Sequence, residues 1–370
     1  MVITGLALQN LRSHKNFVLK FTEKTTIIVG DNAMGKTSII EALSLLSTGD
    51  SFRAGKIEEM INFDSDLARV KGVVSYESDS ILSERSLNLD QKNEKDEIEI
   101  ILTHGEVNGR RTQHRLFTVN GVKRRKKDAI GKFYSVVFRP EDMRLIEGSP
   151  SRRRGFLNNL LSMISPQYEV AFKNYEQTLK RRNKLLMQVR EREQPRTSLQ
   201  YWNLSLVKYG EIIQKHRQDF LASFSSVGFP VNFEIEYDPS IISQSRIEEY
   251  IDREIASGHS LVGPHKDDII IFLTQKNRRL RLDTFGSRGQ QRLGVLWLKF
   301  CELEYLAATT KKTLLLLDDI LSELDDDSKA LALSVLEKYQ SVITTTDEGV
   351  VEEIKRHTNS YTVLNLKNLV

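Results

Sequence analysis

The run of residues from Gly30 to Thr37 carries the clearest chemical pattern in the chain. Its sequence, GDNAMGKT, fits the spacing G-x-x-x-x-G-K-[ST] without a gap. In such a loop the backbone N–H groups surround a phosphate, the lysine reaches the β- and γ-phosphates, and the next hydroxyl binds Mg²⁺. We therefore predict an ATP site rather than a plain glycine-rich turn. Its nucleotide-binding residues are Gly30, Asp31, Asn32, Ala33, Met34, Gly35, Lys36, Thr37 and Ser38, and Lys36 is also assigned to catalysis.

Two adjacent carboxylates, Asp318 and Asp319, follow the apolar stretch from Thr313 to Leu317. An apolar strand that ends in acidic residues is the expected distant partner of a phosphate-binding loop. We predict that Asp318 holds Mg²⁺ together with Thr37, and that Asp319 is the catalytic residue that orients or deprotonates the attacking water. The alternative is a strand that simply ends in a solvated acidic turn.

Residues 287–290, with the sequence SRGQ, resemble the core of the signature motif of ABC ATPases. They precede the acidic pair, and Ser322 and Asp325 follow it where a D-loop would lie. In ABC ATPases the signature contacts the γ-phosphate of ATP on the opposite subunit, so the resemblance implies a homodimer that forms on ATP binding. These enzymes usually carry glutamate where Asp319 stands, and the shorter side chain implies slow hydrolysis. The signature residues acting in trans are Ser287, Arg288, Gly289 and Gln290.

The elements that must position these motifs are a strand, a loop and a helix. Thr25–Val29 is an apolar β-branched run, too short for a helix, and it predicts a buried strand. Ile39 and Leu43 begin a helical spacing that ends at Gly49. Alternating segments between residues 68 and 119, joined by polar turns that include Asn-Gly at 108–109 and 120–121, predict an antiparallel β subdomain. Further strands are predicted at 133–138, 268–273, 313–317, 341–345 and 361–364.

The segment from residue 151 to about 224 differs in character, because it consists of long polar helical stretches. Two apolar stripes with 3,4 spacing flank Pro195 and predict an antiparallel pair of helices, with Trp202 in its core. We therefore predict an α/β protein, an ABC-type P-loop ATPase head with a mixed sheet and an antiparallel β subdomain, plus a helical insert. The head, lobe I, comprises residues 1–142 and 259–370, and the insert, lobe II, comprises residues 143–258.

The composition of the 370 residues, 39% hydrophobic and 28% charged, is that of a globular protein. We see neither a secretory signal nor a stretch of roughly 18 uncharged apolar residues, so we expect a soluble cytoplasmic protein without a membrane partner. The single cysteine excludes an internal disulfide and a cysteine-based metal cage.

The net charge of +4 is too small to indicate a polyanion partner, but the basic residues are unevenly distributed. Runs of lysine and arginine occur at residues 123–127, 152–154 and 180–184. A single run is more often a solvated face, whereas three runs favour contact with nucleic-acid phosphates. No helix shows a base-reading pattern, which favours recognition of DNA structure over sequence. The predicted DNA-binding residues are Lys123, Arg124, Arg125, Arg152, Arg153, Lys180 and Arg181.

Nearly the whole chain resembles the RecF family of bacterial recombination mediators, which are related to the heads of SMC-type ATPases. The stretches 138–157 and 263–268 are the specific ones, because transporters and SMC proteins lack them. The resemblance rests on residues 10–14 (NLRSH), 138–142 (FRPED), 146–150 (IEGSP), 153–157 (RRGFL), 263–268 (GPHKDD) and 318–325 (DDILSELD).

The resemblance implies an ATP-dependent dimer that binds DNA at single-strand gaps and, with RecR and RecO, promotes RecA loading. It implies ATP and Mg²⁺ as cofactors, weak DNA-stimulated ATP hydrolysis with a regulatory role, and a place at the nucleoid. It also puts Arg12 near the γ-phosphate, although a lone loop arginine is often only solvated. Glu141 stands where transporters have their Q-loop, and the resemblance implies that it relays nucleotide state to the insert.

Some residues depart from the family pattern, and three other functions have to be weighed against it. Lys266 stands where the family usually has arginine, and Arg139 where it usually has a small residue. An ABC transporter subunit is a rival, but its switch histidine appears here as a threonine within 344–346. An SMC-like structural ATPase is another, but the paired helices are far shorter than a coiled-coil arm. A nuclease would need a further acidic cluster beyond Asp318 and Asp319.

Overall fold

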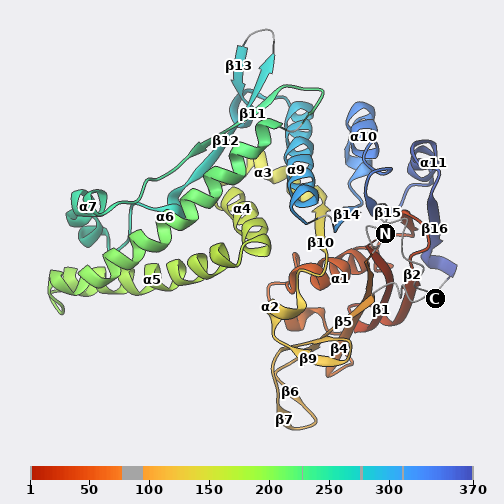
Figure 1. Ribbon diagram of the computed structural model, residues 1–370, viewed down its shortest axis with the longest axis horizontal. Coiled ribbons are helices and arrows are strands. Elements are labelled where there is room, and N and C mark those ends of the chain that lie inside the picture. Colours follow the sequence, from red (N-terminus) through yellow and green to blue (C-terminus); the bar gives the residue numbers. More distant parts are fainter. Residues whose placement is uncertain (1, 77–94, 227, 276–277, 311, 369–370) are drawn as a thin grey trace, which may run out of the picture. The chain divides into compact units, whose positions relative to one another are not determined.

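The computed structural model describes two compact units. One comprises residues 1–142 and 302–370, and the other comprises residues 143–301. The predicted insert, 143–258, lies within the second unit, which continues to Cys301 and includes strand β12 (Asp268–Gln275), paired with β11 (Phe233–Asp238). The described residues are 2–76, 95–226, 228–275, 278–310 and 312–368 (Figure 1).

A five-stranded parallel sheet in the first unit carries the nucleotide-site motifs. Every residue of its three inner strands is buried, which matches the continuous apolar runs in the sequence. The carboxyl ends of these strands lead into the glycine loop, the acidic pair and the threonine run. In sheet order the strands are β10 (Tyr134–Phe138), β14 (Thr313–Asp318), β15 (Gln340–Thr345), β3 (Thr25–Val29) and β16 (Tyr361–Asn365).

A six-stranded antiparallel sheet forms the rest of the core of this unit and confirms the predicted β subdomain. The predicted Asn-Gly turns are present, with Asn108 and Asn120 at φ 51° and 53° and their glycines at 74° and 75°. In sheet order the strands are β2 (His14–Lys20), β1 (Ile3–Leu11), β4 (Leu67–Ser75), β5 (Lys95–Thr103), β8 (Arg115–Val119) and β9 (Val122–Arg124). A short hairpin, β6 (Glu106–Val107) and β7 (Arg110–Arg111), follows β5.

Helix α1 (Lys36–Thr48) contacts both sheets and ends at Gly49 as predicted. The close approach to the antiparallel sheet depends on Gly72, since a Cβ atom there would lie 2.6 Å from Leu46 Cδ1. The glycine loop is thereby attached to a helix that is buried along most of its length. The remaining helices of this unit are α2 (Lys126–Ala129), α10 (Asp326–Leu333) and α11 (Glu348–His357).

The second unit contains the predicted helix pair, α5 (Pro166–Arg190) and α6 (Gln200–Ala222), which pack against each other (Figure 1). The prediction for Trp202 is wrong, because Leu199 and Leu206 fill the seam while Trp202 lies half-buried at its edge, under the Arg181 guanidinium. The other elements are α3 (Arg144–Glu147), α4 (Pro150–Ile164), α7 (Gln244–Ser257), β13 (Arg278–Arg281), α8 (Leu282–Phe285) and α9 (Arg288–Thr310), which runs past the end of this unit.

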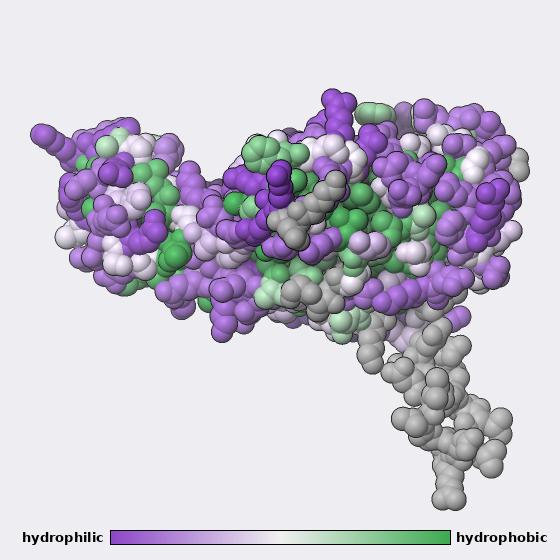
Figure 2. All heavy atoms as spheres, turned by 90° about the horizontal axis from the view of Figure 1, so that it is seen from above, coloured by the Kyte–Doolittle hydropathy of each residue, from purple (hydrophilic) through white to green (hydrophobic). Residues whose placement is uncertain are grey.

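Hydrophilic side chains predominate on the face of the molecule drawn in Figure 2. Within the described ranges, no helix combines the length and the apolar character needed to cross a lipid bilayer.

Candidate nucleotide site

The glycine loop has the backbone geometry of a phosphate cradle. Ala33 and Gly35 adopt left-handed conformations, with φ of 66° and 88°, which turn the backbone between β3 and α1. A Cβ atom on Gly35 would lie 2.8 Å from Ser13 Oγ, and His14 Nε2 is 3.0 Å from the Gly35 carbonyl oxygen. The turn between β1 and β2 therefore packs closely against the glycine loop, and this contact requires glycine at position 35.

Lys36, the first residue of α1, crosses the loop with its side chain. The residue is 6% exposed, and its Nζ donates to the carbonyl oxygens of Gly30 at 2.8 Å and Asp31 at 3.1 Å. Both acceptors are neutral, so neither compensates the ammonium charge. A cation held beside backbone N–H groups at a helix start is suited to bind phosphate.

Thr37 and Asp318 meet as predicted for a Mg²⁺ site. Thr37 Oγ1 donates to Asp318 Oδ1 at 3.1 Å, and Thr344 Oγ1 donates to the same oxygen at 2.9 Å. Burial raises the pKa of Asp318, against the opposing effect of the two hydroxyls. A hydroxyl and a carboxylate form the partial ligand set that Mg²⁺ takes when phosphate and water supply the rest. Within the described ranges no group of three or more His, Cys, Asp or Glu side chains could hold a metal.

Asp319 has an unusual conformation with an unsatisfied acceptor. Its φ is 53°, and its backbone N–H donates to the Thr344 carbonyl oxygen at 3.2 Å and to Thr344 Oγ1 at 3.1 Å. Among the described residues its buried Oδ1 has no hydrogen-bond donor. Such an orphaned acceptor costs about 1–3 kcal/mol, and a bound water would satisfy it. The predicted role of Asp319 in orienting water therefore fits this geometry.

The predicted D-loop residues have local structural contacts. Ser322 Oγ donates to the Asp319 carbonyl oxygen at 2.9 Å. Asp325 Oδ1 accepts from the Ser328 N–H at 2.9 Å and caps helix α10. Both contacts fix the chain that follows the acidic pair.

Arg12, which the resemblance puts near the γ-phosphate, is bound to other groups of the chain in this structure. Its Nε and Nη2 bind the two carboxylate oxygens of Glu41 at 3.1 Å and 2.9 Å, and its Nη1 donates to the Glu59 carbonyl oxygen at 2.6 Å. To reach a phosphate, the guanidinium would have to leave the fully buried Glu41. The sequence analysis missed Glu41, although a glutamate inside an otherwise apolar helical run is a signal for a buried ion pair.

The signature residues begin helix α9 in the second unit. Gln290 N–H donates to Ser287 Oγ at 3.3 Å, and Ser287 N–H donates to Gln290 Oε1 at 2.9 Å. This reciprocal pair is a helix-capping arrangement. Ser287 and Arg288 are exposed, and Gly289 is partly exposed.

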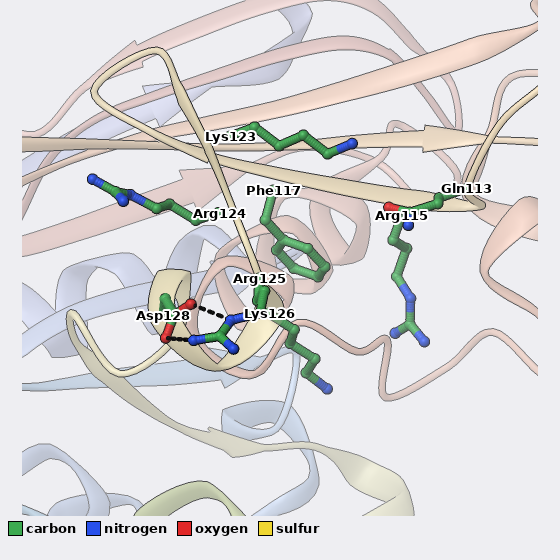
Figure 3. Close-up of a pocket in the computed structure, with 8 residues that line it drawn as sticks. All are labelled: Gln113, Arg115, Phe117, Lys123, Arg124, Arg125, Lys126 and Asp128. Atoms are coloured by element: carbon green, nitrogen blue, oxygen red, sulfur yellow. Dashed lines mark hydrogen bonds and ion pairs between the residues drawn. The ribbon is translucent and has the colours of Figure 1, made fainter.

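The first basic run lines a hollow of about 580 Å³ at the antiparallel sheet (Figure 3). Lys123 and Arg124 are exposed, and Arg125 pairs with Asp128 at 2.8 Å. Burial alone would raise the pKa of Asp50, but hydrogen bonds from Lys126 and Arg115 outweigh it and lower the pKa. The lining residues are Gln113, Arg115, Phe117, Lys123, Arg124, Arg125, Lys126 and Asp128.

The other two basic runs are divided between surface and core. Arg152, Lys180 and Arg181 are exposed and remain DNA-contact candidates. The prediction for Arg153 is corrected, because this side chain is buried and binds both oxygens of Asp268 at 2.7 Å and 2.8 Å. Arg153 thus joins helix α4 to strand β12, and its charge is already paired.

Comparison with known proteins relates the chain to one family. The profile described as "RecF/RecN/SMC N terminal domain" matches residues 2–367. DNA replication and repair protein RecF of Bacillus mycoides (strain KBAB4) is 32% identical over 99% of this chain and 97% of that protein. RecF of Bacillus cytotoxicus is 32% identical over 95% of this chain and 94% of its own length.

Solved structures agree. The recombination mediator protein RecF-ATPrS of the RecFOR pathway superposes with a TM-score of 0.81 at 30% identity, over 98% of this chain and 95% of that one. An Smc head domain from Pyrococcus furiosus, at 16% identity and a TM-score of 0.52 over 98% of this chain and 93% of that one, shares the fold alone. The predicted fold class, an ABC-type ATPase head, is confirmed. By sequence and by structure, the chain belongs to the RecF family.

Proposed function

We propose that this protein binds ATP, hydrolyses it slowly and acts in DNA replication and repair. Relatives named DNA replication and repair protein RecF, and solved structures of RecF-ATP and RecF-ATPrS, support the proposal. The observation that carries it is the meeting of Lys36, Thr37 and Asp318 at one edge of the parallel sheet. A metal-bound triphosphate would complete this arrangement of cation, hydroxyl and carboxylate.

The side chains of the site take different parts in the reaction. Lys36 would exchange its carbonyl contacts for β- and γ-phosphate oxygens. Thr37 and Asp318 would hold Mg²⁺, which neutralises phosphate charge when bound. Asp319 would use its free acceptor to orient the attacking water, and its short side chain is the reason to expect slow turnover.

ATP binding would also bring two copies of the chain together. The exposed start of helix α9, with Ser287, Arg288 and Gly289, offers N–H groups and a serine hydroxyl to the γ-phosphate held by a second copy. Ser322 and Asp325 would lie near that contact as the D-loop. Each ATP would then be enclosed by two subunits, and hydrolysis would release the dimer.

DNA would bind through phosphate contacts rather than base reading. The exposed cations of the hollow, Lys123 and Arg124, together with Arg152, Lys180 and Arg181, supply positive charge for a backbone. Within the RecFOR pathway named for the solved relatives, this protein would bind at single-strand gaps in the nucleoid of the cytoplasm. RecR and RecO would be its partners, RecA loading the outcome, and DNA would stimulate its ATP hydrolysis.

Replacing Lys36 by methionine tests ATP binding directly. Lys36→Met removes the cation facing the phosphates and keeps a side chain of similar length, so we expect ATP affinity to fall by about 100-fold or more, as for loss of a charged hydrogen-bonding partner. Fluorescence titration with ATP and Mg²⁺ measures the effect. Lys20→Met, which removes an exposed lysine from the end of β2, is the matched control. Equal ATP affinity in Lys36→Met and Lys20→Met would refute the proposed site.

A further inference from the structure

Arg139 lies at the same sheet edge as the acidic pair. It directly follows strand β10, and Phe138, the last residue of β10, is paired in parallel with Leu317. Arg139 therefore leaves the sheet beside Asp318, the next residue of the neighbouring strand β14. The charge of Arg139 also acts to lower the pKa of Asp318, which supports their proximity.

The Arg139 guanidinium is held by long contacts. Its Nη2 forms an ion pair with Asp142 Oδ1 at 3.3 Å, its Nη1 is 3.4 Å from the Phe52 carbonyl oxygen, and its Cζ lies 4.4 Å from the centre of the Phe52 ring. Both hydrogen bonds are at the long end of the normal range. Its Nε is buried and has no hydrogen-bond acceptor among the described residues. The Nε–H of Arg139 is therefore available to donate to a ligand.

Arg12 provides the contrast, because its guanidinium is bound by Glu41 and the Glu59 carbonyl oxygen at 2.6–3.1 Å. Arg12 would lose three good hydrogen bonds by turning to a phosphate. Arg139 would lose two long ones, one of them its ion pair with Asp142, and would satisfy its orphaned Nε. A triphosphate carries several negative charges, and Lys36 alone supplies a side-chain cation from the glycine loop.

We propose that Arg139 is a further nucleotide-binding residue, whose guanidinium binds the γ-phosphate on the Asp318 side of the site. The inference rests on the proposed function, since it presumes that ATP occupies the loop around Lys36. A planar guanidinium donates two parallel hydrogen bonds to a phosphate group, and an ammonium does not. Arg139 should accordingly distinguish ATP from ADP, which has no γ-phosphate.

The test compares ATP and ADP affinity in three variants by isothermal titration calorimetry. Arg139→Gln removes the charge but keeps the hydrogen bond from the backbone N–H of residue 139 to Asp142 Oδ2 at 3.0 Å. We expect its ATP affinity to fall about tenfold with ADP affinity unchanged, as for one charged hydrogen bond. Arg139→Lys should recover part of the loss. Arg53→Gln, at an exposed position beside Phe52, should bind both nucleotides like the unmodified protein.

The outcomes separate the possibilities. Unchanged ATP affinity in Arg139→Gln, or equal losses for ATP and ADP, would overturn the inference. A lower unfolding temperature without nucleotide, together with an unchanged ratio of ATP to ADP affinity, would assign Arg139 a purely structural role and also overturn it. If the unmodified protein binds neither nucleotide, the proposed function itself fails.

Discussion

Two groups of buried charges in this protein differ in how completely their hydrogen bonds are made. In the second unit, Asp267 Oδ1 accepts from Gln214 Nε2 and the Ser240 N–H, both at 2.9 Å, and its Oδ2 accepts from Arg217 Nη1 at 2.7 Å and from the Tyr237 hydroxyl. In the first unit, by contrast, Asp319 retains a buried oxygen for which the described residues supply no donor.

The cations differ in the same way. Arg217 is 1% exposed, and its three nitrogens contact Tyr168, Asn158, Pro264 and Asp267 at 2.7–3.2 Å. Lys36 is 6% exposed, and within the described part of the chain its ammonium donates to the carbonyl oxygens of its own loop.

This difference shows how the hydrogen bonds of buried charges can distinguish a ligand site from the scaffold of the fold. A cluster whose donors and acceptors are all paired within the chain belongs to the fold. A cluster that leaves a cation without an anion, and an acceptor without a donor, is completed by a ligand. The stretch GPHKDD, residues 263–268, therefore belongs to the scaffold of its unit, while the glycine loop and the acidic pair form the proposed binding site.

Breaking the paired cluster should give the largest effect on stability. Asp267→Asn leaves the charge of Arg217 buried without a counter-ion, and we expect the free energy of unfolding to fall by about 3–5 kcal/mol. Urea denaturation followed by circular dichroism measures it. Asp238→Asn, at an exposed position on the end of β11, should change the free energy by less than about 0.5 kcal/mol. A loss below about 1 kcal/mol in Asp267→Asn would contradict the structural role of this cluster.

Removing the Asp319 carboxylate, whose Oδ1 has no donor among the described residues, should slow the reaction and leave the fold intact. Asp319→Asn lacks the group that orients water, so we expect ATP hydrolysis to slow by about 100-fold or more. The Thr37–Asp318 pair remains, so ATP should still bind and the variant should stay dimeric with ATP and Mg²⁺. Phosphate release and light scattering measure these properties. Asp326→Asn, whose side chain is 98% exposed, is the control. Normal hydrolysis in Asp319→Asn would remove that residue from the mechanism.

The smallest predicted effect is a pH dependence of the free energy of unfolding. It concerns His265, which lies beside the paired cluster. Its ring contacts the Tyr175 hydroxyl at 2.8 Å and the Ser260 carbonyl oxygen at 3.0 Å, and burial lowers its pKa from 6.5 to about 4. The unfolded chain therefore binds a proton more readily than the folded protein between these values. The stabilising contribution of the neutral ring is complete above pH 6.5 and is lost as the pH falls toward 4.

We expect this proton linkage to remove on the order of 2 kcal/mol of stability from the unmodified protein between pH 7 and pH 4.5. Urea denaturation at a series of pH values measures the slope. His265→Gln cannot titrate and should show a shallower slope over the same interval. Parallel slopes for the two proteins would show that His265 does not control this part of the pH dependence.

The local features of the fold and of the proposed site were predictable from sequence, because neighbours along the chain determine them. The glycine loop, the buried strand before it and the Asn-Gly turns all follow from the residues within a few positions. The partners of charged residues were not predictable in this way. Arg153 pairs with Asp268, which is 115 positions away, and Arg182 with Glu254, which is 72 positions away. A run of basic residues shows its charge in the sequence, whereas its burial depends on the tertiary structure.

The order of strands in the parallel sheet has a consequence for how the protein is made. Strand β3, which leads into the glycine loop, pairs only with β15 and β16 in this sheet, and these strands end at Thr345 and Asn365. A ribosome adding about 5–20 residues per second synthesises the intervening chain in tens of seconds. During that time β3 and the loop have been translated but lack both neighbouring strands. The proposed nucleotide site can therefore be assembled only after β15 and β16 have been translated, and a chain truncated before β15 would lack both neighbours of β3.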